Sequence, residues 1–152
     1  MVGTPAGNES YQGRNRESKS GALPLIAEYF QEVEFRLKNA EIIADKSIDL
    51  REFSATEGML RGKLLFVDGS VLEFMEYLKE ENRLKYRFHL MDMHGSMVLR
   101  YDNAPHHKDV SSFPHHKHLP SNVAESVDKS LMDVLDEIEI LMSDAIGRGI
   151  KP

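Results

Sequence analysis

The sequence predicts an α+β domain in which a helix, an antiparallel meander of four to five strands, a histidine-rich loop and a second helix follow one another. Two observations predict this order. Apolar residues recur at helical spacing near both ends of the chain, and the stretches between them alternate around Asp-Gly and His-Gly steps. A chain of 152 residues that is 41% hydrophobic is large enough for one domain with its own core. We therefore expect a single domain over residues 23–146, with both helices on the apolar face of the sheet.

The two ends and the overall composition bound the class of protein. Residues 1–22 are polar, lack helical or strand period, and are predicted to be a disordered tail, with a short tail at 147–152. The absence of cysteine excludes thiolate metal sites and cysteine nucleophiles and suits a reducing compartment. No apolar run approaches the roughly 20 residues of a membrane span, and no signal peptide is evident. The sequence thus predicts a cytoplasmic protein without membrane contact.

The first helix is predicted over residues 24–38. Apolar side chains recur there every three to four positions, and Pro24 suits a first helical turn. The next stretch, 41–54, contains KSIDLREF, which alternates in part, and is predicted to be a strand.

The C-terminal helix carries an apolar stripe over residues 131–142. Ser130 and Asp133 have the spacing of an N-terminal capping box, and a start at Asn122 with Glu125 is the alternative.

The first hairpin turns at the Asp-Gly step, 68–69. A two-residue loop would oppose apolar and charged side chains, whereas a three-residue loop over 67–69 places Leu64 opposite Leu72. The sequence therefore predicts the three-residue loop, with its glycine in the left-handed region.

The second hairpin turns at the His-Gly step, 94–95, which is predicted to be a two-residue loop. That loop places Leu90 opposite Leu99 and the oppositely charged Arg87 and Asp102 opposite each other.

The same alternation predicts a polar second face of the sheet with five cations and two anions. A net charge of −6 argues weakly against a chain coated in basic charge, so a basic face stands out against it, although strands commonly place Lys and Arg outward. Leu84 is predicted to point to the apolar side together with Tyr86. The predicted polar face consists of Arg61, Lys63, Glu73, Tyr77, Lys85, Arg87, His89, Arg100 and Asp102.

Five of the seven histidines follow the last predicted strand. Imidazole titrates near neutral pH, so one ring can accept a proton while another donates one. RNA cleavage without metal needs such a base and acid, together with cations that stabilise the charge on phosphorus. The predicted catalytic residues are His106, His107, His115, His116 and His118. The predicted substrate-binding residues are Arg100, Tyr101, Lys117, Arg87 and His89.

Two other interpretations of the histidine segment stay open. A divalent transition metal is the alternative to a site without cofactor, with His106, His116, His118 and Asp102 as ligands, although their spacing matches no metal motif. The histidines can also be structural, each satisfying a backbone carbonyl of a loop stiffened by prolines.

The motifs RYDNAPHH and FPHHKH resemble the signature of the TumE family, toxin components of type II toxin–antitoxin pairs. The similarity extends over residues 24–142, including LRGKLLFVDGSVLEFMEYL, KYRFHLMD and the acidic helix SLMDVLDEIEILM. The resemblance implies a small intracellular toxin that binds a cognate antitoxin, and analogy with other toxins of this size makes RNA the expected substrate. It assigns no catalytic residues. A His-rich metal-binding protein and a non-enzymatic interaction module are the alternative functions.

Overall fold

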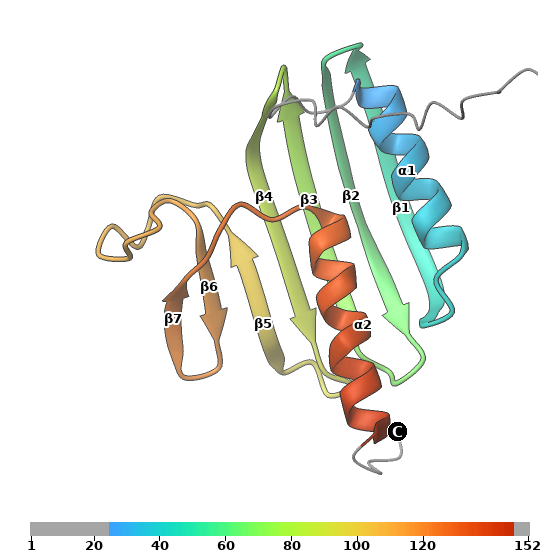
Figure 1. Ribbon diagram of the computed structural model, residues 1–152, viewed down its shortest axis with the longest axis vertical. Coiled ribbons are helices and arrows are strands. Elements are labelled where there is room, and N and C mark those ends of the chain that lie inside the picture. Colours follow the sequence, from blue (N-terminus) through green and yellow to red (C-terminus); the bar gives the residue numbers. More distant parts are fainter. Residues whose placement is uncertain (1–24, 148–152) are drawn as a thin grey trace, which may run out of the picture.

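The computed structural model describes residues 25–147, which form a seven-stranded antiparallel sheet with both helices on one face (Figure 1). The strands lie in the sheet in chain order, from β1 at one edge to β7 at the other. The elements are α1 (Ile26–Lys38), β1 (Ile43–Ser54), β2 (Glu57–Phe66), β3 (Val71–Lys79), β4 (Asn82–Met91), β5 (Met97–Asp102), β6 (His116–Leu119), β7 (Asn122–Glu125) and α2 (Leu131–Gly147).

The α+β class and the order of helices and sheet are confirmed, but the predicted strand count is too low. The two additional strands, β6 and β7, lie in the segment predicted as loop and helix start. Their apolar content is too small to signal a strand, and pairing with β5 makes them extended. The predicted tail 1–22 lies outside the described residues, as does the predicted tail 147–152 except for Gly147, which is the last residue of α2.

The start of α2 confirms the capping box and excludes the earlier start. Asn122 belongs to β7. The backbone N–H of Ser130 donates to the Asp133 carboxylate at 2.9 Å, and the Asp133 N–H donates to the Ser130 hydroxyl at 3.2 Å. Each side chain thus satisfies a backbone donor of the other.

The hydrophobic core lies between the helices and the sheet. The helix stripes and the inward side chains of β2 to β5 form one buried cluster, with α1 over β1 and β2 and α2 over the middle of the sheet (Figure 1). Leu60, Leu64, Leu72, Phe88 and Val134 are among its wholly buried members. Burial on this face fixes the strand register, because a slip of one residue would turn every apolar side chain outward.

The first hairpin has the predicted register and loop. Leu64 pairs with Leu72, and the N–H of Phe66 donates to Ser70 at 2.9 Å. The intervening three-residue loop ends at Gly69, whose φ of 86° is in the left-handed region that glycine tolerates without strain.

The predicted two-residue loop of the second hairpin is wrong. The N–H of Asp92 donates to Ser96 at 2.8 Å, so three residues form the turn, and Gly95 has a φ of 82°. A register shift after Leu90 absorbs the additional residue. Farther from the turn the predicted pairing is therefore correct, and Leu90 lies opposite Leu99.

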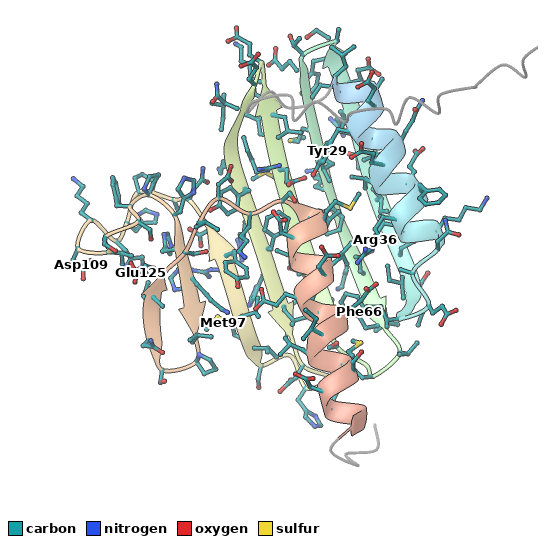
Figure 2. The ribbon with its side chains drawn as sticks, viewed as in Figure 1. Tyr29, Arg36, Phe66, Met97, Asp109 and Glu125 are labelled. Carbon is teal, nitrogen blue, oxygen red and sulfur yellow. The ribbon has the colours of Figure 1, made fainter. Side chains whose placement is uncertain are left out.

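A second register shift, between Tyr77 and Leu78, overturns the predicted orientation of Leu84. Leu84 is 50% exposed, and Arg83 instead lies on the helix side, where its Nε is 2.9 Å from the buried Glu76 carboxylate. Glu76 also accepts hydrogen bonds from the hydroxyl of Tyr29 and from the backbone N–H that begins α2. Figure 2 shows Tyr29 between α1 and the sheet. This buried network ties both helices to β3.

Candidate functional site

No helix of residues 25–147 covers the second face of the sheet, the open face (Figure 1). Strand pairing extends it beyond the predicted strands, because His118 lies opposite Arg100 and His116 opposite Asp102. Directly paired residues share a face, so two of the clustered histidines join the predicted polar face. The open face is defined by Arg61, Lys63, Glu73, Tyr77, Lys85, Arg87, His89, Arg100, Asp102, His116 and His118.

Asp102 connects the charged groups at this end of the open face. Its Oδ1 is 2.9 Å from Nε2 of His116 and accepts the backbone N–H of Ala104 at 3.0 Å. Its Oδ2 accepts from Nε of Arg100 at 3.1 Å. The side chain of Asp102 is 8% exposed, so this member of the predicted polar face is buried. A buried carboxylate with these donors is compensated.

His116 is held at both ring nitrogens and is 1% exposed. Its Nδ1 lies 2.8 Å from the carbonyl oxygen of Pro114, and its Nε2 lies against the Asp102 carboxylate. Both partners are acceptors, so each ring nitrogen can contribute only as a donor. His116 is thus too enclosed to meet a substrate directly, and it orients Asp102.

His118 lies next in the same series of contacts. Its Nε2 is 3.0 Å from a terminal nitrogen of Arg100, and guanidinium can only donate, so Nε2 accepts and the ring is neutral in this arrangement. Burial and then the charge of Arg100 lower the pKa of His118 below its usual 6.5. An imidazole that stays neutral below pH 6.5 is suited to accept a proton.

His107 completes a cluster of three imidazoles. The loop between β5 and β6 folds back over the open face, so that the ring centroid of His107 lies 4.8 Å from that of His116 and 5.1 Å from that of His118. The far part of this loop reaches β7, where the hydroxyl of Ser111 donates to Glu125 (Figure 2). His107 is partly exposed, in contrast to His116.

The other two predicted histidines do not join the cluster. His106 is exposed on the loop. His115 lies before β6, stacks on the ring of Tyr86 at a centroid distance of 5.8 Å, and its Nδ1 is 2.8 Å from the Tyr86 hydroxyl. The structural interpretation of the segment thus fits His115, while His107, His116 and His118 converge.

Tyr101 and Lys117 lie on the helix side of the sheet, away from the cluster. The hydroxyl of Tyr101 donates to Glu137 of α2 at 2.6 Å, and Nζ of Lys117 is 3.1 Å from the same carboxylate. The structure therefore does not bring these two predicted substrate-binding residues to the site, because alternation along β5 and β6 turns them toward α2.

Arg87 and His89 lie beside the cluster on β4. Arg87 is paired with Asp102 in the predicted register, but the Asp102 carboxylate contacts Arg100 and His116 instead. Arg87 is exposed and forms no ion pair within residues 25–147. Burial and the charges of Arg87 and Arg100 lower the pKa of His89.

The three clustered imidazoles could also hold a metal ion, since each offers a nitrogen within 4.8 Å of the other two. The set differs from the predicted one, because His107 takes the place of His106 and Asp102 is not part of it. An ion would compete for ring nitrogens that already have partners. Both nitrogens of His116 are held, and Nε2 of His118 accepts a hydrogen bond from Arg100. The side chains present are therefore better satisfied as a hydrogen-bonded group than as a ligand set.

The sequence did not predict that Asp102 connects the charged groups of the site, or that the carbonyl of Pro114 holds His116. Asp102 was predicted only as a face residue and an alternative metal ligand. The signal that could have predicted its contacts is the alternation HxH at 116–118, because it places both rings on one face of a strand that pairs with β5.

An antiparallel α+β protein with a histidine cluster on the open face of its sheet is the class that fold and site define. A family model described as Toxin TumE matches residues 23–142, and the chain belongs to this family of toxins. No curated protein and no solved structure matches the chain. Neither helix of residues 25–147 is long and apolar enough to cross a membrane.

Proposed function

We propose that this toxin cleaves RNA without a metal, with His118 as the general base and His107 as the general acid. The observation that carries the proposal is the convergence of these two rings with Arg100 on the open face. Membership of a toxin family makes a cellular target necessary, and RNA is the target that a base, an acid and neighbouring cations can attack.

In the proposed step, the bond that forms and the bond that breaks belong to the same phosphodiester linkage. His118 takes the proton of the 2′-hydroxyl, the 2′-oxygen forms a bond to the adjacent phosphorus, and the bond from phosphorus to the 5′-oxygen breaks. His107 gives a proton to that 5′-oxygen. The products are a 2′,3′-cyclic phosphate and a 5′-hydroxyl, and one proton has moved from His118 to His107 through solvent when the cycle closes.

Arg100 has two successive partners in this proposal. In the free protein its guanidinium occupies the Nε2 lone pair of His118. A phosphate that draws the guanidinium to itself frees that nitrogen for the 2′-hydroxyl. Arg87, exposed on the adjacent strand, supplies a second cation to the phosphate, and cations there stabilise the additional charge on the pentacoordinate phosphorus.

The test is cleavage of total RNA and tRNA by purified protein in EDTA, with analysis of the ends formed. We expect cyclic phosphate ends, and a loss of about 10²-fold or more in rate for His118→Asn and for His107→Gln. His106→Gln is the matched control, because it makes the same chemical change at the sequence neighbour of His107, which lies outside the cluster. Intact RNA in EDTA, or variants that cleave as fast as the control, would refute the proposal.

A metal-dependent function is the second candidate, favoured by the approach of three imidazole nitrogens within 4.8 Å. Elemental analysis of protein purified without a polyhistidine tag decides it. About one equivalent of zinc, nickel, copper or manganese, lost in His107→Gln but not in His106→Gln, would support it. Less than about one-tenth of an equivalent would exclude a tight imidazole site.

A cognate antitoxin is the protein partner that family membership suggests. We propose that the product of a neighbouring gene binds the chain and suppresses its toxicity in the cytoplasm. Co-expression should restore growth and yield a complex that survives purification, and growth arrest that no neighbouring gene relieves would contradict it.

A further inference from the structure

The strand β1 forms one edge of the sheet that residues 25–147 build. It is twelve residues long, and within residues 25–147 it pairs with β2 alone. Figure 1 places it at the outer margin, beside α1. Its outward backbone N–H and C=O groups are a template for a further strand. The opposite edge, β7, offers only four residues.

Apolar surface continues from the core to this edge. A groove between α1 and β1 is lined by the apolar Leu37, Ile48 and Leu50 together with the charged Glu34, Lys38 and Lys46. Ile48 and Leu50 pack against the core yet are only partly buried. A strand added to β1 would extend the sheet beside α1 and cover these side chains.

Charge selects the strand that fits. Register shifts at both ends of β1 leave a regular stretch over 45–52. If a second copy pairs with it antiparallel, the helix sides of the two sheets lie on the same side only when the register is centred on a residue rather than between two residues. Three such registers place like charges opposite each other. The register centred on 46 pairs Lys46 with Lys46, the one centred on 47 pairs Asp45 with Asp49, and the one centred on 49 pairs Asp49 with Asp49.

The register centred on Ile48 has no such conflict. It places Ile48 against the partner's Ile48, and it pairs Asp45 with the partner's Arg51 on the open face. By symmetry that attractive pair occurs twice. A register centred on Leu50 also avoids like charges, but it extends beyond the regular stretch into the shift after Glu52.

We propose that the occupant of the β1 edge is a second copy of this chain, joined through β1 in the register centred on Ile48. The two seven-stranded sheets become one continuous sheet, with the two α1 helices adjacent on one side and the two open faces exposed on the other. The histidine clusters, near the opposite edges, stay accessible in the dimer.

The test is the mass of the full-length protein by sedimentation equilibrium between about 1 and 100 µM. We expect a dimer that Arg51→Asp weakens about thirtyfold or more, because two attractive pairs become repulsive. Asp45→Arg should weaken it likewise. The exchange of both residues in one chain restores the attraction and should return dimerisation to within about threefold of the parent.

Arg61→Asp is the control, since it makes the same charge change on the open face of β2, one strand away from the edge. A parent protein that is monomeric at 100 µM overturns the proposal. So does a double exchange that fails to restore the dimer while the circular dichroism of the fold is unchanged. A monomer whose β1 amides become protected from hydrogen exchange only on binding another protein assigns the edge to that protein instead. None of these outcomes depends on RNA cleavage.

Discussion

Replacement of Asp102 by Asn tests whether one carboxylate organises the candidate site. The substitution keeps the size of the side chain and removes its charge. An amide retains one oxygen, which can still accept from His116 or from the N–H of Ala104, but its NH₂ group faces the Nε donor of Arg100. We expect lower stability and slower RNA cleavage together.

The magnitude follows from the interactions that the amide cannot make. Breaking a buried ion pair costs about 3–5 kcal/mol, and a hydrogen bond to a charged group contributes about 1.5–3 kcal/mol. Arg100 is 31% exposed, so water compensates for part of the broken ion pair. Asp102→Asn should therefore lower the free energy of unfolding by about 2–4 kcal/mol, or Tm by roughly 8–15 °C for a domain of this size.

The assay is urea unfolding at pH 7 followed by circular dichroism, beside the cleavage assay at a temperature where both proteins are folded. Asp49→Asn is the matched control, because its carboxylate pairs with Arg51 and Arg61 on the sheet surface and is 41% exposed. Removing that charge should cost under about 1 kcal/mol. If the two variants lose equal stability, or if Asp102→Asn cleaves RNA at the parental rate, the carboxylate does not organise the site.

Three further predictions concern titration, the buried network and the turns. Because burial and Arg100 lower the pKa of His118, the acidic limb of kcat/KM should lie below pH 6.5, and Arg100→Gln should move it upward; a limb that does not move contradicts the assigned base. Folding likewise favours neutral His118, so its contribution to stability is present above pH 6.5 and falls as pH decreases below that value. Burial raises the pKa of Glu76, so Glu76→Gln should cost about 1–3 kcal/mol at pH 7 in urea unfolding, and the cost should grow as the pH falls through the raised pKa toward 4.5, because the parental carboxyl then binds its proton more readily in the folded chain than in the unfolded one. Gly69→Ala should cost about 1–2 kcal/mol for its positive φ plus a close contact at 3.1 Å, whereas Gly95→Ala meets open space and should cost less; equal costs in thermal unfolding would contradict the contact.

Much of the open face was predictable because the sheet has one buried side. The alternation of Tyr86, Phe88 and Leu90 fixes which side chains of β4 face the helices, and the opposite face follows. The error at Leu84 shows the limit of this rule. A register shift that buries Arg83 against Glu76 depends on α1 and α2, which lie far away in the sequence.

The grouping of the histidines shows the same division. Local sequence places His116 and His118 on one face of an extended segment, and it places His106 beside His107 without distinguishing them. The return of the loop over β5 decides that His107 joins the cluster, while Tyr86 holds His115 apart.

By itself, the sequence determined the α+β class, the two helices, the first hairpin and the polarity of each sheet face, because these depend on periodicity and on turn residues a few positions apart. The tertiary structure alone decided that β6 and β7 extend the sheet, that Asp102 is buried among its donors, and that three of five histidines meet. The physical reason is that each of these requires backbone hydrogen bonds or charge contacts between segments distant in the chain, and such contacts leave no periodic pattern in the residues that make them.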